Sequence, residues 1–171
     1  MRYTIVTETS RLILRYFTLD DLDDLTLILA DAEVMQFSLN GVKTRLQTEE
    51  FLYWILNCYQ KYHFGLYAII NRSDKLLIGF CGLLVWHFEE QIEIEIAYRL
   101  ARAYWGKGRG TEAAIAVRDY ARNILSIERL ICLIQSENMR SIRVAQKLGM
   151  HYEKNIVLQG LNVRIYSSSS S

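Results

Sequence analysis

The sequence contains no proline among its 171 residues. Proline commonly marks helix starts, turns and sheet edges, so element boundaries must be inferred from glycines, helix caps and hydrophobic periodicity. No run approaches the roughly 20 apolar residues that a membrane-spanning helix requires, and no apolar stretch near the N-terminus resembles a signal peptide. The sequence therefore predicts a cytoplasmic chain with no membrane partner.

Cysteine and histidine are also scarce, with three of each. Cys58, Cys81 and Cys132 are widely separated, odd in number and embedded in apolar segments, a pattern that favours reduced thiols over disulfides. The histidines do not lie at ligand spacing from cysteines or carboxylates. We therefore expect no metal site.

Neither sign of charge dominates, because 20 basic and 19 acidic residues leave a formal net charge of +1. Such a balance offers no electrostatic support for a nucleic-acid partner. About half of the residues are apolar and about a quarter are charged, which is typical of a globular domain of this length. One domain is expected over residues 1–166, and the five serines at 167–171 are expected to form a disordered tail.

Hydrophobic periodicity predicts strands alternating with amphipathic helices. Strands are expected at residues 12–17, 66–70, 76–86, 91–100, 130–134, 152–158 and 163–166. Helices are expected to begin near Thr18, near Thr48, after a glycine-rich loop at 106–110, and at Asn138. The order βααβββαβαββ predicts an α/β domain of the α+β type, with a mixed, mostly antiparallel twisted sheet. A central parallel strand–helix–strand unit and helices on both faces are also expected.

The strongest local signal is the segment Gly106-Lys107-Gly108-Arg109-Gly110, which stands between an alternating strand and an amphipathic helix. Glycines allow a tight turn and close approach of the backbone to a ligand. The first N–H groups of the helix are unpaired and lie at its positive end, so they favour an anion such as phosphate. Lys107 and Arg109 add cationic side chains that could contact further phosphate oxygens.

The type of phosphate ligand can be narrowed from the residues around this loop. A nucleotide-binding P-loop is excluded, because no Gly-Lys-Ser/Thr sequence ends the segment. The pattern Gly108-x-Gly110-x-x-Ala113 formally matches a dinucleotide fingerprint. That fingerprint requires an acidic residue at the end of the next strand, whereas Glu128 precedes the strand, so the dinucleotide hypothesis is weakened.

Residues 104–113, Tyr-Trp-Gly-Lys-Gly-Arg-Gly-Thr-Glu-Ala, resemble the acetyl-CoA pyrophosphate loop of the GNAT acyltransferase superfamily. Three further segments resemble its RimJ/RimL-like branch, which acetylates protein N-termini: residues 9–15, residues 95–98, and residues 138–141 with 147–150. The likeness spans nearly the whole chain in matching order. It implies the acyl-CoA N-acyltransferase fold, acetyl-CoA as co-substrate and an amine as acceptor.

The resemblance also implies roles for particular residues. Backbone groups of Tyr98, Arg99 and Leu100 would bind the pantetheine arm, and Asn138 would bind the coenzyme near the thioester. The pyrophosphate would be held by backbone N–H groups of Gly106, Lys107, Gly108, Arg109, Gly110 and Thr111. Two departures from the family pattern stand out. Trp105 occupies a place where Gln or Arg is usual, and Ala145 replaces a tyrosine acid, so Ser141 becomes the candidate acid.

An amine attacks a thioester only in its neutral form, so a base is useful. Glu93 and Glu95 project from the same face of one strand, and two carboxylates so close would raise the pKa of at least one. Glu95 is the candidate base because it lies nearer the expected thioester. The alternative is that both carboxylates are solvated on an exposed face of the sheet.

Three functional hypotheses are compatible with the sequence. The first is an N-acetyltransferase acting on a protein or peptide N-terminus, or on a polyamine, aminoglycoside or amino acid, by direct attack in a ternary complex. The second is a coenzyme A-binding module with little catalysis, and the third is a nucleotide-dependent enzyme. Oligomeric state is not encoded in any visible pattern, and a homodimer is one option.

Overall fold

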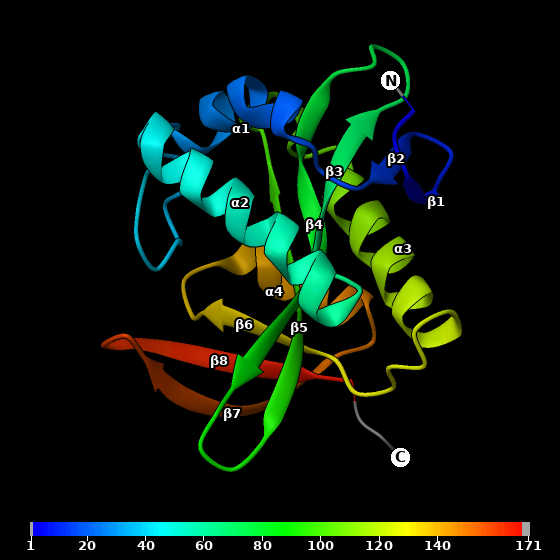
Figure 1. The fold of residues 1–171 in the computed structure, drawn as a ribbon. Coiled ribbons are helices and arrows are strands. Elements are labelled where there is room, and N and C mark those ends of the chain that lie inside the picture. Colours follow the sequence, from blue (N-terminus) through cyan, green and yellow to red (C-terminus); the bar gives the residue numbers. More distant parts are fainter. Residues whose placement is uncertain (1, 169–171) are drawn as a thin grey trace.

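The computed structural model describes residues 2–168 and shows a twisted mixed sheet with helices on both faces (Figure 1). The strands are β1 (Ile5–Glu8), β2 (Leu12–Arg15), β3 (Leu66–Asn71), β4 (Leu77–His87), β5 (Ile92–Leu100), β6 (Ile131–Gln135), β7 (His151–Leu158) and β8 (Leu161–Ser167). The helices are α1 (Leu22–Leu29), α2 (Arg45–Tyr62), α3 (Arg109–Asn123) and α4 (Met139–Lys147), with 3-10 turns at Leu19–Asp21 and Arg102–Tyr104.

The predicted order of elements is confirmed, with two differences at the N-terminal end. Strand β1 was not predicted, because its four residues are exposed or only half-buried and form an edge strand that carries no buried apolar pattern. Helix α2 begins at Arg45 rather than near Thr48. Its cap is Thr44, whose hydroxyl accepts from the N–H of Gln47, and the Gln47 side chain accepts from the Thr44 N–H in return.

Within residues 2–168 the strands follow the order β1-β2-β3-β4-β5-β6-β8-β7. Neighbouring strands are antiparallel except β5 and β6, which are parallel and are connected through α3. A parallel pair needs such a crossover, because a short turn can join only antiparallel neighbours. The predicted fold class, including the central parallel strand–helix–strand unit, is therefore confirmed.

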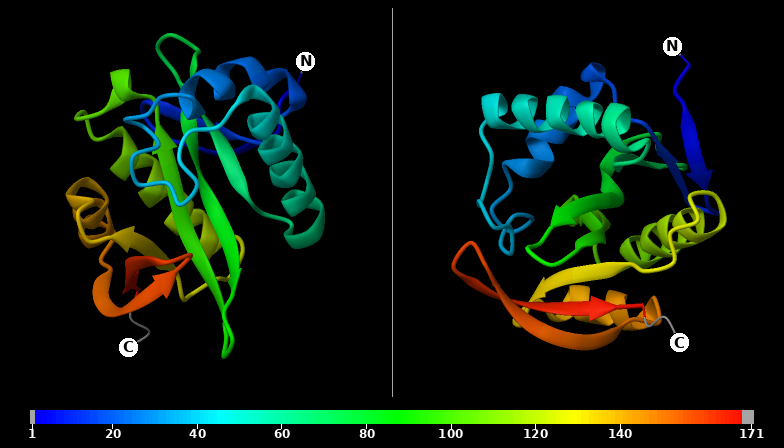
Figure 2. Two further views of the ribbon diagram at one scale, coloured as in Figure 1. Left: turned by 90° about the vertical axis from the view of Figure 1, so that its left-hand side faces the viewer. Right: turned by 60° about the horizontal axis from the view of Figure 1, so that its bottom comes forward.

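Two hydrophobic cores lie on opposite faces of the sheet. Helices α1 and α2 cover one face, where Leu25, Leu52 and Ile55 are fully buried. Helices α3 and α4 cover the other face, where Val117 and Ile142 are buried. Figures 1 and 2 show these helix pairs on either side of the long strands β4 and β5. The sheet is therefore buried on both sides along its centre.

Strands β5 and β6 pair over a short stretch and then splay apart, and the candidate site lies where they separate. Among the residues that the structure describes, Glu95 and Ile131 form the only register pair between these two strands. The C-terminal part of β5, from Ala97 to Leu100, therefore has no partner strand on the side of β6, whereas the Ile96 carbonyl still accepts from the Cys132 thiol. Unpaired main-chain groups on such an edge can bind an extended ligand.

The serine-rich end is more ordered than expected. Ser167 belongs to β8, and Ser168 donates its N–H to the carbonyl of Leu130. The Ser168 hydroxyl in turn accepts from the Leu130 N–H. The prediction of a disordered tail over 167–171 is therefore wrong for these two serines, because each pairs with the β6 region. Residues 169–171 lie outside the described part of the chain.

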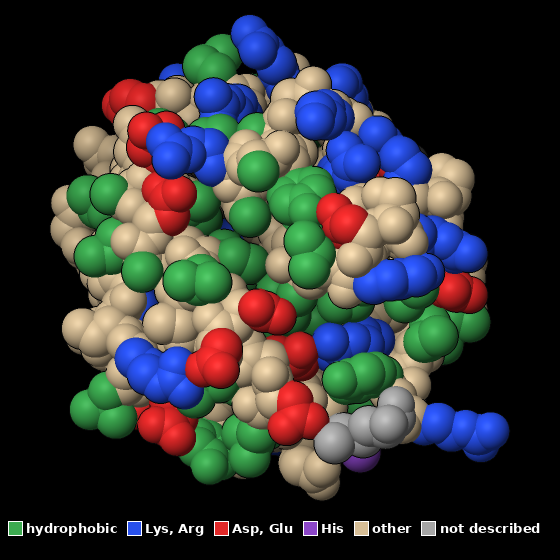
Figure 3. All heavy atoms as spheres, turned by 90° about the horizontal axis from the view of Figure 1, so that it is seen from above, with side chains coloured by type: hydrophobic (Ala, Val, Ile, Leu, Met, Phe, Trp, Pro, Cys, Tyr) green, Lys and Arg blue, Asp and Glu red, His purple; other side chains and the backbone are tan. Residues whose placement is uncertain are grey.

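The surface charge and the hydropathy of the helices bear on whether the protein binds a charged polymer or a membrane. On the face seen from above, Lys and Arg side chains gather mainly along the top and right, and Asp and Glu side chains lie mainly at the left and in the lower half (Figure 3). Among the helices of residues 2–168, none combines the length and apolar character needed to cross a bilayer.

Candidate functional site

The glycine-rich loop forms a left-handed turn that leads directly into α3. Gly106 and Gly108 adopt φ angles of +74° and +79°, which strongly favour glycine, and Gly108 is the N-cap residue of the helix. Successive N–H groups in such a turn point into one concavity, to which the helix dipole adds positive potential. Such a turn before a helix N-terminus is suited to binding an anion, and the binding of a pyrophosphate here stays a prediction.

This loop is held from outside by Arg11 of the segment before β2. The Arg11 guanidinium donates to the carbonyl of Lys107 at 2.8 Å and forms an ion pair with Glu112 at 2.6 Å. Glu112 also accepts from the Thr9 hydroxyl and the Arg11 N–H, and these bonds lower the pKa of its carboxyl despite partial burial. The contacts fix the loop against the N-terminal strands.

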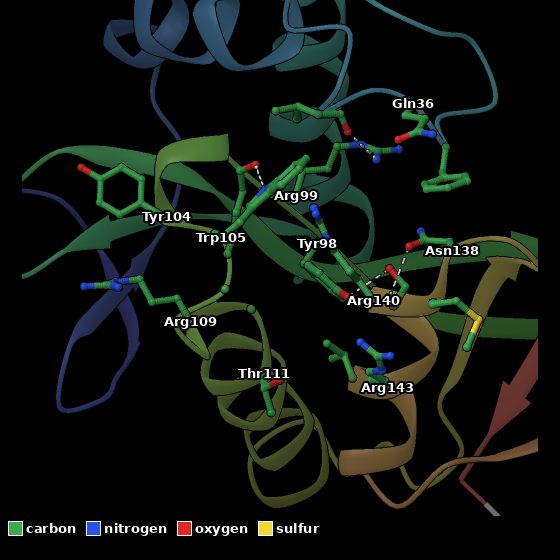
Figure 4. Close-up of a pocket in the computed structure, with 18 of the residues that line it drawn as sticks. Gln36, Tyr98, Arg99, Tyr104, Trp105, Arg109, Thr111, Asn138, Arg140 and Arg143 are labelled. Carbon is green, nitrogen blue, oxygen red and sulfur yellow. Dashed lines mark hydrogen bonds between the residues drawn. The ribbon is translucent and has the colours of Figure 1, made fainter.

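A cavity of about 880 Å³ extends from the glycine-rich loop along β5 to the N-terminal end of α4. We call it the larger cavity. Figure 4 shows its side chains converging from β5, the loop and α4. The predicted coenzyme-binding residues that line it are Tyr98, Arg99, Leu100, Gly106, Gly108, Arg109, Gly110, Thr111 and Asn138. The candidate acid Ser141 also lines it, so one cavity brings these residues together.

Lys107 is the exception, since it does not line the larger cavity and its side chain is exposed. Leu100 also differs from expectation, because its carbonyl already accepts from the Trp105 indole N–H at 2.9 Å. Trp105, the departure from the family pattern, therefore joins β5 to the loop. Its ring lies 4.3 Å beneath the Arg140 guanidinium carbon, which places an additional cation at the cavity wall.

Helix α4 begins at the point where the larger cavity meets β5. Asn138 caps the helix by accepting the Ser141 N–H through its side-chain oxygen, at 3.3 Å. The Ser141 hydroxyl receives a hydrogen bond from the Tyr98 hydroxyl at 3.0 Å. Tyr98 thus contributes its side chain to the site in addition to the backbone groups that the family resemblance implied.

A second cavity, of about 400 Å³, adjoins the first, and we call it the smaller cavity. Its wall is mainly apolar and combines β4 and β5 with the α1–α2 connection and the β7–β8 hairpin. Five residues line both cavities: Phe37, Tyr98, Arg99, Asn138 and Ser141. The two spaces therefore meet beside the Tyr98–Ser141 pair.

Glu95 lies in the wall of the smaller cavity with only 8% of its surface exposed. Burial raises the pKa of its carboxyl to about 7, although a 2.7 Å hydrogen bond from the Trp86 indole, the Leu133 main-chain N–H and the charge of Arg99 all act to lower it. A carboxylate with this pKa can accept a proton near neutral pH. The expected rise in pKa is present, but its cause is burial rather than repulsion from Glu93.

Glu93 is buried as well, with 2% of its surface exposed, but it lies outside both cavities. It forms a 2.8 Å ion pair with Arg129, which also contacts Glu153. The alternative that both carboxylates are solvated is therefore wrong. Glu93 is buried and paired with Arg129, so its role is structural. Of the two carboxylates, only Glu95 faces a cavity.

Several lining residues were not predicted from sequence. Trp86 is adjacent to Glu95 only through the pairing of β4 with β5, and Lys43 reaches the smaller cavity from the loop before α2. Neither belongs to a local motif, so no sequence signal marks them. Arg140 could have been noticed, because it follows Asn138 in a cationic helix start.

The cysteines are unsuited to nucleophilic catalysis. Cys81 and Cys132 are buried, and desolvation raises the pKa of both thiols. A neutral thiol is a poor nucleophile. Within residues 2–168 no group of three His, Cys, Asp or Glu side chains is arranged to bind a metal.

The raised pKa of Glu95 predicts a pH-dependent penalty on stability. The folded protein retains this proton between the usual carboxyl pKa of about 4.5 and about 7, whereas the unfolded chain loses it, so stability falls as pH rises through that window. Glu95→Gln removes the ionisation. We expect the variant to match the wild type at pH 5 and to exceed it at pH 8 by up to ~3 kcal/mol in free energy of unfolding.

Chemical denaturation at both pH values measures this difference. Glu93→Gln is the matched control, because it breaks the ion pair with Arg129 and is expected to lower stability at pH 8. Equal stability of Glu95→Gln and wild type at pH 8 would contradict the raised pKa.

Comparison with known sequences identifies relatives over most of the chain. The profile of a family described as an acetyltransferase (GNAT) domain matches residues 11–151. The uncharacterized protein YkkB of Bacillus subtilis (strain 168) is 34% identical over 165 residues, which cover 95% of this chain and 94% of that protein. Spermidine N(1)-acetyltransferase of Escherichia coli (strain K12) is 30% identical over 96 residues, 52% of each chain.

Comparison with solved structures gives the same fold. The ribosomal L7/L12 alpha-N-protein acetyltransferase RimL, in complex with coenzyme A, superposes with a TM-score of 0.82 at 19% identity. The match covers 96% of this chain and 97% of that one. At this level of identity the likeness establishes the fold and leaves the acceptor to be argued from the site.

Proposed function

Because the chain belongs to the GNAT acetyltransferase family, we propose that it transfers the acetyl group of acetyl-CoA to the α-amine of a protein or peptide N-terminus. Acetyltransferase activity and acetyl-CoA as co-substrate follow from the family. The acceptor and the roles of individual residues are the proposed part. The observation that carries this part is the meeting of two cavities beside Tyr98 and Ser141, with Glu95 in the wall of one of them.

The larger cavity fits the coenzyme. The main-chain N–H groups of residues 106–111 bind the pyrophosphate at the start of α3, and Arg140 adds positive charge at the cavity wall. The Arg109 guanidinium instead donates to the Asn71 side chain at 3.2 Å and packs beside the Tyr104 ring. The unpaired edge of β5 binds the pantetheine arm and directs it towards Asn138 and Ser141. The thioester then lies at the junction of the two cavities, where an amine in the smaller cavity can reach it.

Matching of pKa values favours an α-amine over a lysine side chain or a polyamine. An α-ammonium has a pKa of about 8, whereas an alkylammonium such as that of lysine has a pKa above about 10. Glu95, with a pKa of about 7, can therefore remove a proton from the former at modest cost. Removing one from the latter requires more than three pKa units of uphill transfer.

The charged side chains of the smaller cavity also favour an α-amine over a polyamine. Among the described residues of its wall, the charged side chains are Lys43, Glu95 and Arg99, two cations and one carboxylate. A polyamine would place its remaining ammonium groups near these cations with no second carboxylate to pair with. A peptide carries a carbonyl next to its terminal amine, and Arg99 can donate to such an oxygen. Partial similarity to a spermidine acetyltransferase therefore does not decide the acceptor.

The mechanism is direct transfer in a ternary complex. Glu95 accepts a proton from the ammonium, directly or through water, and the neutral nitrogen attacks the thioester carbonyl carbon. A second proton leaves the nitrogen as the amide forms, and the sulfur departs with the electron pair of the C–S bond. Ser141 donates a hydrogen bond to the sulfur, and the thiolate takes up one proton while the other passes to solvent. We also propose a cytoplasmic location, because a reducing compartment would keep the three free cysteines as thiols.

An acceptor panel with acetyl-CoA tests this proposal. We expect turnover of peptides with a free N-terminus, and kcat/KM at least tenfold lower for spermidine and for the same lysine-containing peptides with a blocked N-terminus. The blocked peptides are the matched control, because they retain every side-chain amine. Faster turnover of spermidine or of the blocked peptides would contradict the α-amine assignment.

A further inference from the structure

Tyr98 and Ser141 form a hydrogen bond whose Tyr98 partner has no part in the mechanism proposed above. Tyr98 belongs to β5 and Ser141 to the first turn of α4, and their hydroxyls are 3.0 Å apart at the junction of the two cavities. Figure 4 shows the Tyr98 hydroxyl directed at the start of α4, next to Asn138. Both residues line both cavities, so the pair borders the space where coenzyme and acceptor meet.

The direction of this hydrogen bond follows from chemistry. A phenol is a better donor and a poorer acceptor than an aliphatic hydroxyl, so Tyr98 donates and Ser141 accepts. Burial raises the pKa of the Tyr98 hydroxyl to about 12, which keeps it protonated at any working pH. The bond therefore persists across the pH range in which the protein is active.

The hydrogen bond from Tyr98 affects where the hydroxyl proton of Ser141 can point. A serine in a helix commonly turns its hydroxyl back to donate to the carbonyl of the preceding turn. Among the described residues the Ser141 hydroxyl has Tyr98 as its only hydrogen-bond partner, and that contact uses an oxygen lone pair. The hydroxyl proton remains available to point into the junction of the cavities.

We propose that Tyr98 is a positioning residue, which orients the Ser141 hydroxyl so that it donates to the coenzyme sulfur as the C–S bond breaks. The inference rests on the proposed function. The Tyr98–Ser141 pair would also supply the proton donor that is missing at Ala145, a buried residue with no hydroxyl. A tyrosine from the strand thereby acts through a serine of the helix, and the pair replaces a single acid on α4.

The first test is titration of the coenzyme A thiol bound to the protein, followed through the ultraviolet absorbance of the thiolate. A donor aimed at the sulfur stabilises the thiolate and lowers the thiol pKa. We expect Ser141→Ala and Tyr98→Phe each to raise the bound thiol pKa, and the double variant to raise it no further than Ser141→Ala. An unchanged thiol pKa in Tyr98→Phe would overturn the inference.

Tyr59→Phe is the matched structural control. The Tyr59 hydroxyl donates to the Leu66 carbonyl and accepts from the Phe17 N–H. Tyr59 lines neither cavity, and although Leu66 lines the smaller one, neither bond reaches the Tyr98–Ser141 pair. Its loss is expected to lower stability without altering the bound thiol pKa. If Tyr59→Phe shifted the thiol pKa as much as Tyr98→Phe, the effect would be one of general loosening, and the positioning role would be wrong.

Steady-state kinetics provide an independent measure. We expect Tyr98→Phe to lower kcat about tenfold, the equivalent of one lost hydrogen bond, with less than a twofold change in the KM for acetyl-CoA. A raised KM with unchanged kcat would overturn the inference. Because the thiol titration uses no acceptor, its result stands even if the acceptor panel rejects the α-amine, and the two proposals can fail separately.

Discussion

Replacing Glu95 with glutamine is expected to lower kcat by about 10²–10⁴-fold while leaving the affinity for acetyl-CoA within about twofold of the wild type. The range is that of a lost general base. Glutamine retains the shape of the side chain and can still accept from the Trp86 indole, so the fold of β4 and β5 should be preserved. Titration calorimetry with acetyl-CoA and turnover with the best peptide of the panel measure the two quantities.

The pH dependence of the same variant sharpens the test. In the wild type, kcat/KM should rise as pH increases through about 7, because Glu95 must be ionised to accept a proton. This inflection should disappear in Glu95→Gln. Glu93→Gln serves as the control, since Glu93 lies outside both cavities and its loss should leave the inflection in place. An unchanged rate in Glu95→Gln would dismiss Glu95 as the base.

Replacing Gly108 with valine is expected to weaken acetyl-CoA binding by at least 100-fold. A β-branched residue is strongly disfavoured at φ +79°, so the turn that directs the N–H groups of the loop would have to change. The added Cβ would also lie 3.4 Å from the Arg11 guanidinium, which holds the loop from outside. The dissociation constant measured by calorimetry reports the effect.

Gly160→Val is the matched control for backbone strain. Gly160 has the same φ of +79° and no neighbour within 4 Å of a built Cβ, and it lies in the β7–β8 turn. Both variants should lose similar stability, but only Gly108→Val should lose coenzyme affinity. Equal affinities in the two variants would show that the loop does not hold the pyrophosphate.

Local signals explain why the glycine-rich loop and its helix could be predicted. The structure gives Gly106 and Gly108 positive φ angles and begins α3 directly after them. Both features depend on neighbouring residues, so the glycines and the helical periodicity of a single sequence were enough to predict them. The same holds for Asn138, whose capping role follows from its position before α4. The family resemblance then ordered these local features along the chain.

Long-range packing explains what could not be predicted. The smaller cavity is assembled from the α1–α2 connection, the middle of the sheet and the β7–β8 hairpin, and no spacing in the sequence brings these together. The environment of Glu95 illustrates the same limit. Its raised pKa was expected from a neighbouring carboxylate, whereas burial beside Trp86 is the cause and Glu93 is paired elsewhere with Arg129.

A crystal structure of the protein saturated with coenzyme A decides whether the glycine-rich loop holds the pyrophosphate. We expect the diphosphate within hydrogen-bonding distance of the main-chain N–H groups of residues 106–111, the pantetheine arm along the open edge of β5, and the sulfur beside the Ser141 hydroxyl. A structure in which the coenzyme is bound elsewhere, with the turn at Gly106–Gly108 unoccupied, would contradict it.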